Sequence, residues 1–196
     1  MSDYVIGITG ASGSIYGVRL IEELASRKHH VDIVITPAGK QVMKEELGVH
    51  DFEKIDRFRL SKLKGDIKLW ENDNFEAPFM SGSNAPDAVV IIPCSMGKLA
   101  AIANGISSNL LERIADVAIK ERKQLILVVR ETPISLIHLE NMVKVARAGA
   151  QMLPAMPAFY HHPKKIEDMV NFIVGKVLSL LKIEHQLFKG WRKEKI

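Results

Sequence analysis

The stretch Tyr4-Val-Ile-Gly-Ile-Thr-Gly-Ala-Ser-Gly-Ser14 decides the fold, because an apolar run stops at glycine and a helical pattern begins directly after it. Its first six residues are rich in β-branched side chains, which is typical of a buried strand. From Ile15 to Leu24 the apolar residues recur at helical spacing. The segment therefore predicts a strand, a glycine-rich turn and a helix in direct succession.

The same alternation continues along the chain. Further strands are predicted at 31–35, 67–70, 88–92 and 125–129, and further helices at 38–47, 99–103, 110–120, 136–148 and 166–181. Residues 48–87 are less regular, and 152–154 are predicted to form a short apolar turn. Near-continuous hydrophobic strands that alternate with amphipathic helices indicate an α/β protein whose parallel sheet is covered on both faces.

Length and composition indicate one soluble domain. The chain has 196 residues, of which 47% are hydrophobic and 26% charged. We expect a domain over residues 1–183 and a basic tail over 184–196. The sequence shows neither an apolar run of the roughly 18 residues that a membrane span needs nor a secretory signal at its start, so a cytoplasmic location is expected.

Charge and cysteine content exclude several classes of site. Lys and Arg exceed Asp and Glu by 27 to 23, a mild excess that is compatible with an anionic ligand. Aromatic residues make up only 6% and do not interleave with a basic stripe, which disfavours a nucleic-acid surface. Cys94 is the single cysteine, so no Cys-rich metal site is expected, and no zinc spacing occurs. No metal is therefore predicted.

The first strand end is a candidate anion site. Glycine at positions 10 and 13 permits close backbone approach, and the free N–H groups of a helix's first turn favour an anion. A tight turn in which Ser14 caps the helix explains the same residues, and both interpretations stay open. A dinucleotide is disfavoured, because the second strand ends at Thr36 without a ribose-binding acid and the glycines lack G-x-G-x-x-G spacing. A mononucleotide fits better.

Two later strand ends carry further polar groups. The turn at 93–98 combines Ser95 with Lys98, while Cys94 within it is expected to be a small buried residue rather than a nucleophile. The predicted strand at 125–129 is followed by Arg130 and Glu131. These two residues are either a solvated ion pair on a surface loop, or Glu131 is an acid/base group. Cations at 113, 120 and 176 on predicted helices are either ligand-binding or plain solvent-facing surface.

Taken together, these segments resemble the flavin prenyltransferases, the UbiX-like family. The matching stretches run in family order over nearly the whole chain: 10–19, 81–83, 93–95, 111–122, 130–133, 138–142 and 157–161. The resemblance implies a three-layer flavodoxin/Rossmann-like fold, a dodecamer, and the transfer of a dimethylallyl group from dimethylallyl phosphate to N5 and C6 of reduced FMN without a metal. The product would serve a UbiD-like decarboxylase.

The resemblance also implies site residues. FMN would be held by Gly10, Ala11, Ser12, Thr36, Ser95, Met96, Gly97, Lys98 and Arg130. Ser81, Arg113, Lys120, Tyr160 and Lys176 would hold the prenyl phosphate, with Glu46 near the same site and often supplied across a subunit interface. The catalytic set would be Glu131, Lys120, Arg113 and Glu46, and the aromatic residues near the prenyl group would be Phe75 and Trp191.

Two departures from the family pattern stand out. Lys176 occupies a position that is commonly Arg, which replaces a bidentate phosphate contact by a point charge. Phe75 stands where some relatives carry Trp, a stronger cation–π surface. Two other functions are alternatives: an FMN-binding cysteine decarboxylase-like enzyme, which would need a catalytic His early in the chain, and a non-catalytic flavin carrier, which would not need Glu131.

Overall fold

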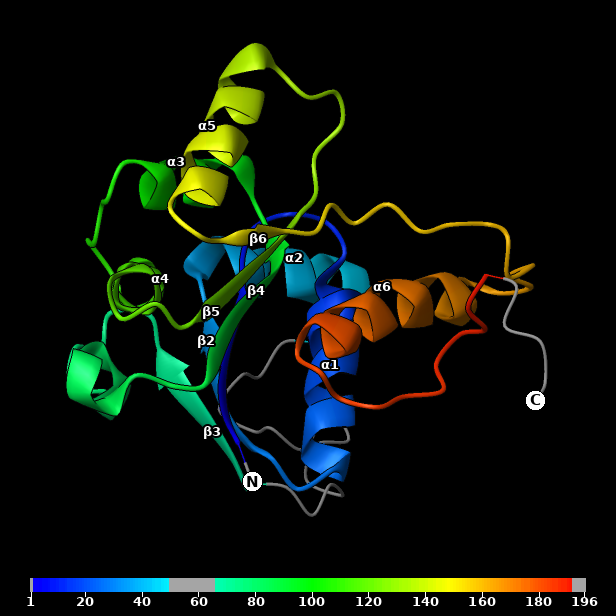
Figure 1. Cartoon of the computed structure of the whole chain (residues 1–196), viewed down its shortest axis with the longest axis horizontal. Helices are drawn as coiled ribbons and strands as arrows, with labels where there is room; N and C mark the ends of the chain where they lie inside the picture. The colour runs from blue at the N-terminus through cyan, green and yellow to red at the C-terminus, as the bar shows by residue number, and fades with distance from the viewer. Residues whose placement is uncertain (1, 50–65, 192–196) are drawn as a thin grey trace.

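A six-stranded, wholly parallel sheet organises the molecule in the computed structural model, which describes residues 2–49 and 66–191 (Figure 1). The strands are β1 (Asp3–Ile8), β2 (His30–Ile35), β3 (Asp66–Glu71), β4 (Ala88–Cys94), β5 (Gln124–Val129) and β6 (Gln151–Met152). The helices are α1 (Ser14–Ser26), α2 (Pro37–Leu47), α3 (Met96–Ala103), α4 (Leu110–Lys120), α5 (Leu136–Arg147) and α6 (Ile166–Leu180), with short 3₁₀ turns η3 (Pro78–Met80) and η4 (Gly82–Asn84).

The strand order β3-β2-β1-β4-β5-β6 is that of a Rossmann-type sheet. In chain order, β2 and β3 are added on one side of β1, and β4, β5 and β6 are added on its other side. The strand order therefore reverses between β1 and β4, which lie side by side and parallel, with Tyr4 opposite Ala88. Loops that leave the carboxyl ends of β1 and β4 diverge at this point, and ligands of open α/β sheets bind there.

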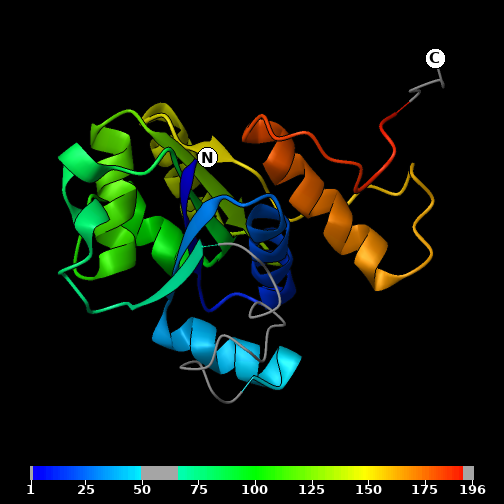
Figure 2. The same cartoon turned by 90° about the horizontal axis from the view of Figure 1, so that it is seen from below.

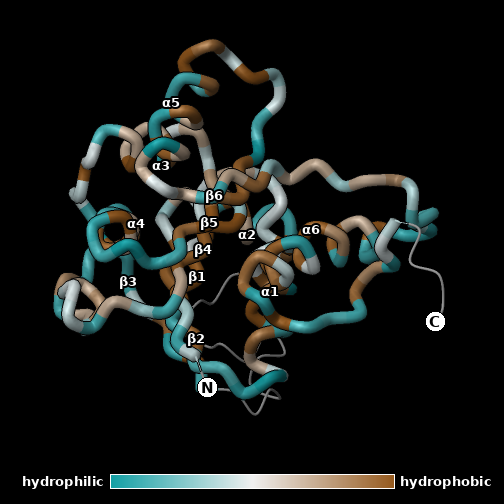
Figure 3. Tube along the Cα trace, in the orientation of Figure 1, coloured by the Kyte–Doolittle hydropathy of each residue, from teal (hydrophilic) through white to brown (hydrophobic). Residues whose placement is uncertain are grey.

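Two apolar layers sandwich the sheet, as the sequence pattern predicts (Figures 2 and 3). Alternate residues of β1 supply both: Ile6 and Ile8 pack toward α1 and α6, whereas Val5 packs toward α3 and α4. Side chains from α1 and α6 fill the first layer, including the fully buried Leu20 and Val177. The predicted three-layer α/β architecture is confirmed.

Four helices begin at a polar side chain that caps them. Thr36 accepts a hydrogen bond from the Gly39 N–H at the start of α2, and Ser95 accepts one from the Lys98 N–H at the start of α3. Asn109 does the same for α4, and Ser135 does so for α5. Such caps satisfy N–H groups that the first helical turn leaves without partners. The first two caps directly follow strands β2 and β4, so both helix N-termini face the carboxyl edge of the sheet.

The predicted elements and the observed ones differ in a few places. Residues 152–154 were predicted to be a turn, but Gln151 and Met152 form the edge strand β6, and Leu153 continues its pairing by donating to the Leu127 carbonyl. A two-residue strand lacks the length that periodicity needs. The possible strand at 67–70 exists and is one residue longer at each end. Residues 50–65 of the irregular region 48–87 lie outside the described residues.

Glycine at position 17 lets α1 lie directly against β4. A Cβ atom built there would sit 2.5 Å from the Ile92 carbonyl oxygen. We expect Gly17→Ala to lower the free energy of unfolding by about 1–3 kcal/mol, because the backbone must shift to admit the methyl group. Gly97→Ala is the matched control, since a Cβ atom at Gly97 meets nothing within 4 Å. Chemical denaturation measures both, and equal stability of the two variants would contradict this packing.

Candidate active site

The carboxyl edge of the sheet brings the ends of β1 and β5 together. Arg130, which follows β5, donates from Nε to the carbonyl oxygen of Ser12 at 3.1 Å. Gly13, which separates Ser12 from α1, has φ +102°, a left-handed conformation that favours glycine. The predicted cofactor-binding residues of the two loops thus share one place, although 118 positions separate Arg130 from Ser12 in sequence.

A carboxylate accepts hydrogen bonds from the backbone N–H groups at the start of α1. Glu46, near the end of α2, accepts hydrogen bonds from the N–H of Gly13 at 2.9 and 3.0 Å and from the N–H of Ser14 at 2.9 Å. Burial raises the pKa of the Glu46 carboxyl, but hydrogen bonds from the Ser12 hydroxyl and from these two N–H groups outweigh burial and lower it. The turn therefore binds an anion, and here Glu46 of the same chain supplies it.

Thr9, which the sequence reasoning missed, joins the ends of β1 and β4. Its buried hydroxyl donates to the Pro93 carbonyl at 2.7 Å and accepts from the Ser95 N–H at 2.8 Å. The two loops are thereby fixed relative to each other. The sequence signal that could have identified Thr9 is a hydroxyl side chain directly before Gly10, at the end of the predicted strand.

Tyr16 is the second missed residue. Its ring lies over Gly13, where an added Cβ atom would come within 2.7 Å of Cε2. Burial and Glu46 raise the pKa of the Tyr16 hydroxyl more than Arg130 lowers it. Tyr16 therefore faces both charged groups of this edge, and the resemblance had included it in a matching stretch without assigning it a role.

The turn after β4 presents backbone rather than an ammonium group. Met96 is buried in the layer beneath α3, while a Cβ atom at Gly97 would meet open space, so a ligand can approach the backbone here. Lys98 was predicted to contact the flavin, but its Nζ donates to Glu112 of α4 at 2.5 Å. Burial raises the pKa of the Cys94 thiol to about 12, and Cys94 is fully buried, which confirms it as a small core residue.

Glu131 stands at the rim of the same edge. Its Oε1 accepts from the Thr132 N–H at 2.9 Å, and the side chain is half-buried. A small hollow of about 70 Å³ adjoins it, with Met96, Arg130 and Met156 among the lining residues. The position suits proton transfer to a bound ligand, because the second carboxylate oxygen accepts no hydrogen bond from the residues that the structure describes.

A second group of predicted residues lies at the amino edge of the sheet. Ser81 shares a hydrogen bond of 2.9 Å with Ser83, and the backbone of Gly82 between them lies against the side chains of Lys120 and Glu121. These residues precede β4 and β5, whose first residues, Ala88 and Gln124, are register partners. Farther along α4, Arg113 pairs with Asp116 at 2.9 Å.

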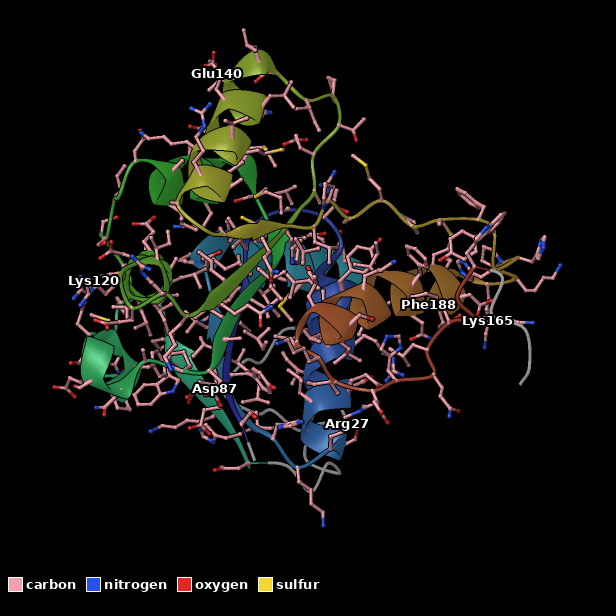
Figure 4. The ribbon with its side chains drawn as sticks, in the orientation of Figure 1. Arg27, Asp87, Lys120, Glu140, Lys165 and Phe188 are labelled. Carbon is pink, nitrogen blue, oxygen red and sulfur yellow. The ribbon has the colours of Figure 1, made fainter. Side chains whose placement is uncertain are left out.

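A third group surrounds α6 on the other face of the sheet. Tyr160 contacts Trp191 edge to face, with ring centroids 5.3 Å apart. Lys176 places Nζ 5.6 Å from the centroid of the Phe172 ring, which Tyr160 also contacts. Phe75, the remaining aromatic candidate, is 50% exposed and follows β3 instead. Figure 4 shows Lys120 and the α6 region on opposite sides of the sheet. One chain therefore holds its predicted donor-binding residues in separate places.

Over residues 2–49 and 66–191, no group of three His, Cys, Asp or Glu side chains is arranged to ligate a metal ion. None of the helices within these ranges combines the length and apolar content that crossing a bilayer requires.

Comparison with known proteins places this site in a class. The model of the family called Flavoprotein matches residues 2–178. A flavin prenyltransferase UbiX of Halalkalibacterium halodurans is 47% identical over 98% of this chain and 94% of its own length. The chain belongs to the flavin prenyltransferase UbiX family of flavoproteins.

Solved structures agree with this placement. AnUbiX (PadA1), in complex with FMN and dimethylallyl pyrophosphate, is 35% identical and superposes with a TM-score of 0.90 over 99% of both chains. A dodecameric FMN-dependent UbiX-like decarboxylase from Escherichia coli O157:H7 is 34% identical, with a TM-score of 0.88 over 97% of this chain and 99% of that one.

The buried ion pair between Lys98 and Glu112 predicts a pH dependence. Burial raises the pKa of Glu112, but Lys98, Ser108 and Asn109 lower it to about 2, from an ordinary 4.5. Because the folded pKa lies below the unfolded one, the stabilisation is complete above about pH 4.5 and is lost as pH falls toward 2.

We expect Glu112→Gln to remove this dependence and up to about 3 kcal/mol of stability at neutral pH. Denaturant unfolding at several pH values measures it. The matched control is Glu121→Gln, which breaks an exposed pair with Lys120 and should cost less than about 1 kcal/mol. Parallel pH profiles for wild type and Glu112→Gln would contradict the assignment.

Proposed function

We propose that this protein is a flavin prenyltransferase that joins the dimethylallyl group of dimethylallyl phosphate to N5 and C6 of reduced FMN. The observation that carries the proposal is the anion-binding turn at the start of α1, bridged by Arg130 to the end of β5. Relatives named for this activity share nearly half of the residues over the full chain.

The carboxyl edge fits FMN. The backbone N–H groups of Gly13 and Ser14 donate to the Glu46 carboxylate. A phosphate group accepts charge-assisted hydrogen bonds of the same kind. The predicted binding set is Gly10, Ala11, Ser12, Thr36, Ser95, Met96, Gly97, Lys98 and Arg130. Within it, Arg130 supplies the cation, whereas Lys98 contributes its backbone because Glu112 engages the ammonium group. Bound reduced FMN supplies the nucleophilic N5 and C6 atoms.

The residues proposed for the prenyl phosphate require a second copy of the chain. Lys120 and Ser81 belong to the face of the sheet that α4 covers, whereas Tyr160 and Lys176 belong to the face that α6 covers. One phosphate group cannot reach across a sheet whose two layers are both packed. We infer that Ser81, Arg113 and Lys120 of one protomer complete the site of another, in a homo-oligomer of dodecameric type.

Proton handling falls to the carboxylates of the carboxyl edge. Joining the dimethylallyl group to both N5 and C6 would release two protons, of which the allyl double bond would take up one and the departing phosphate, leaving as hydrogen phosphate, the other. Glu131 stands at the rim as the acid/base residue, and Glu46, held near Ser12, is the second carboxylate near the reacting groups. The product serves a UbiD-like decarboxylase in this proposal, and a cytoplasmic location stays a prediction.

Mass spectrometry of the flavin separates this proposal from the two alternatives. Purified protein is incubated anaerobically with reduced FMN and dimethylallyl phosphate, or with the pyrophosphate in a parallel reaction. A flavin heavier by one C5 unit supports the prenyltransferase. Unchanged FMN with both donors would contradict it and favour a carrier, while oxidation of a thiol-bearing substrate would favour the cysteine decarboxylase-like enzyme.

Replacing the rim carboxylate tests its role. We expect Glu131→Gln to retain FMN but to slow product formation by about 10²–10⁴-fold, the usual cost of losing general acid–base catalysis. Glu140→Gln on the exposed surface of α5 is the matched control and should behave like wild type (Figure 4). Wild-type turnover by Glu131→Gln would remove this carboxylate from the mechanism.

Mixed oligomers test the shared site. Lys120→Ala and Arg130→Ala are each expected to be inactive, because the shared site is proposed to take Arg130 with the bound FMN from one protomer and Lys120 from another. Unfolding and refolding the two variants together should restore part of the activity, since some sites then receive both intact halves. The control is each variant refolded alone. No recovery in a mixture that reassembles to the wild-type size would contradict a site shared between copies.

A further inference from the structure

The segment that follows α6 turns back along that helix instead of leaving the domain. Leu187 and Phe188 pack against the layer formed by α1 and α6. This segment, residues 184–191, belongs to the tail that the sequence analysis separated from the domain at residue 183. Figures 1 and 4 show it returning beside α6, with Phe188 close to the helix.

Phe188 occupies a notch on α6 that exists because residue 175 is glycine. A Cβ atom at Gly175 would lie 2.6 Å from Phe188 Cε1 and 2.7 Å from His185 Cε1. No real Cβ atom tolerates such distances, so any larger residue at this position displaces the Phe188 ring. Gly175 is itself buried in the middle of α6, where glycine costs helix stability. The close aromatic contact is what this glycine permits.

The seated ring belongs to a chain of aromatic contacts that ends at two predicted donor-site residues. Phe188 contacts Phe172 with ring centroids 4.8 Å apart, and Phe172 contacts Tyr160 at 5.9 Å. Tyr160 then contacts Trp191 at 5.3 Å. Lys176, the residue after Gly175, holds its Nζ 5.6 Å from Phe172 and 5.8 Å from Phe188. The notch therefore fixes both the segment and the surroundings of Lys176.

A hydrogen bond of 2.9 Å between the Ser179 hydroxyl of α6 and His185 Nε2 also holds the segment against the helix. Residues 183–186 and 188–190 line an open hollow of about 1120 Å³, together with Ser179 and with Arg27, the residue after α1. His161, which stacks on Phe172 at 5.3 Å, is sealed beneath the segment with neither ring nitrogen hydrogen-bonded. A closed segment thus buries two polar atoms at a cost, which favours opening.

We propose that Phe188 and Gly175 are positioning residues for the prenyl-phosphate site: the ring seated in the notch holds residues 184–191 closed and thereby keeps Trp191 against Tyr160, beside Lys176. The consequence for binding of the donor rests on the proposed function. The closed arrangement of residues 184–191 does not depend on that function. The closed segment supplies an apolar aromatic wall for a dimethyl-substituted allyl group, and the cation next to the notch faces its phosphate.

The first test measures the segment without any ligand. Hydrogen–deuterium exchange of peptides covering residues 184–191 is compared for wild type, Phe188→Ala and Gly175→Ala. Both variants should exchange faster in this segment, by about tenfold, because the ring loses its seat. Phe159→Ala, which removes a neighbouring exposed ring, is the matched control and should exchange as wild type does. Unchanged exchange in both variants would overturn the proposal.

The second test measures the donor. KM for dimethylallyl phosphate should rise about tenfold in Phe188→Ala and Gly175→Ala, while the FMN dissociation constant stays at its wild-type value. Gly175→Ala combined with Phe188→Leu should recover part of both losses, because the shorter side chain leaves room for the new methyl group. A merely destabilised helix would not recover in this way.

The failures are distinguishable. Faster exchange together with an unchanged donor KM would overturn the positioning role while leaving the prenyltransferase in place. If wild type itself forms no prenylated flavin, the proposed function fails, and with it the donor consequence. A double variant as impaired as Gly175→Ala alone would refute the fit between ring and notch.

Discussion

Two backbone N–H groups at the start of α1, those of Gly13 and Ser14, have no acceptor within their helix and bind the carboxylate of Glu46 instead. The rest of the site depends on where these donors lie. Gly17 lets α1 pack onto β4 with no side chain between them, and Thr9 ties β1 to the turn after β4. The anion-binding end of α1 is thereby fixed beside β1 and β4, where the order of the strands reverses.

The cations near the proposed site differ in their partners and in their position on the sheet. Arg130 is committed to the Ser12 carbonyl by one nitrogen and leaves its remaining guanidinium donors at the edge. Lys98 of α3 pairs with Glu112 of α4 and so stabilises the fold. The other cations of interest, Lys120 and Lys176, lie on opposite faces of the sheet. A single chain therefore does not bring these two cations together.

The sequence predicted the layered fold because each strand and helix carries its own periodicity. Helix 110–120 was placed at its observed limits, since Asn109 and Lys120 bound a clean amphipathic pattern. Strand β6 was missed because two residues show no period. At the site, the strand-end rule located Ser12 and Arg130 correctly at one edge, but pairings that join distant segments cannot be read from spacing.

Three such pairings changed the picture of the site. Lys98 turned away from the proposed ligand toward Glu112, Glu46 reached the turn of its own chain, and Phe188 found its seat on α6. Hydrogen–deuterium exchange with and without FMN tests the central claim most directly. FMN should protect the amides of 10–14 and 95–98 at the carboxyl edge. Unchanged exchange there, with FMN bound and protection arising elsewhere, would contradict the account.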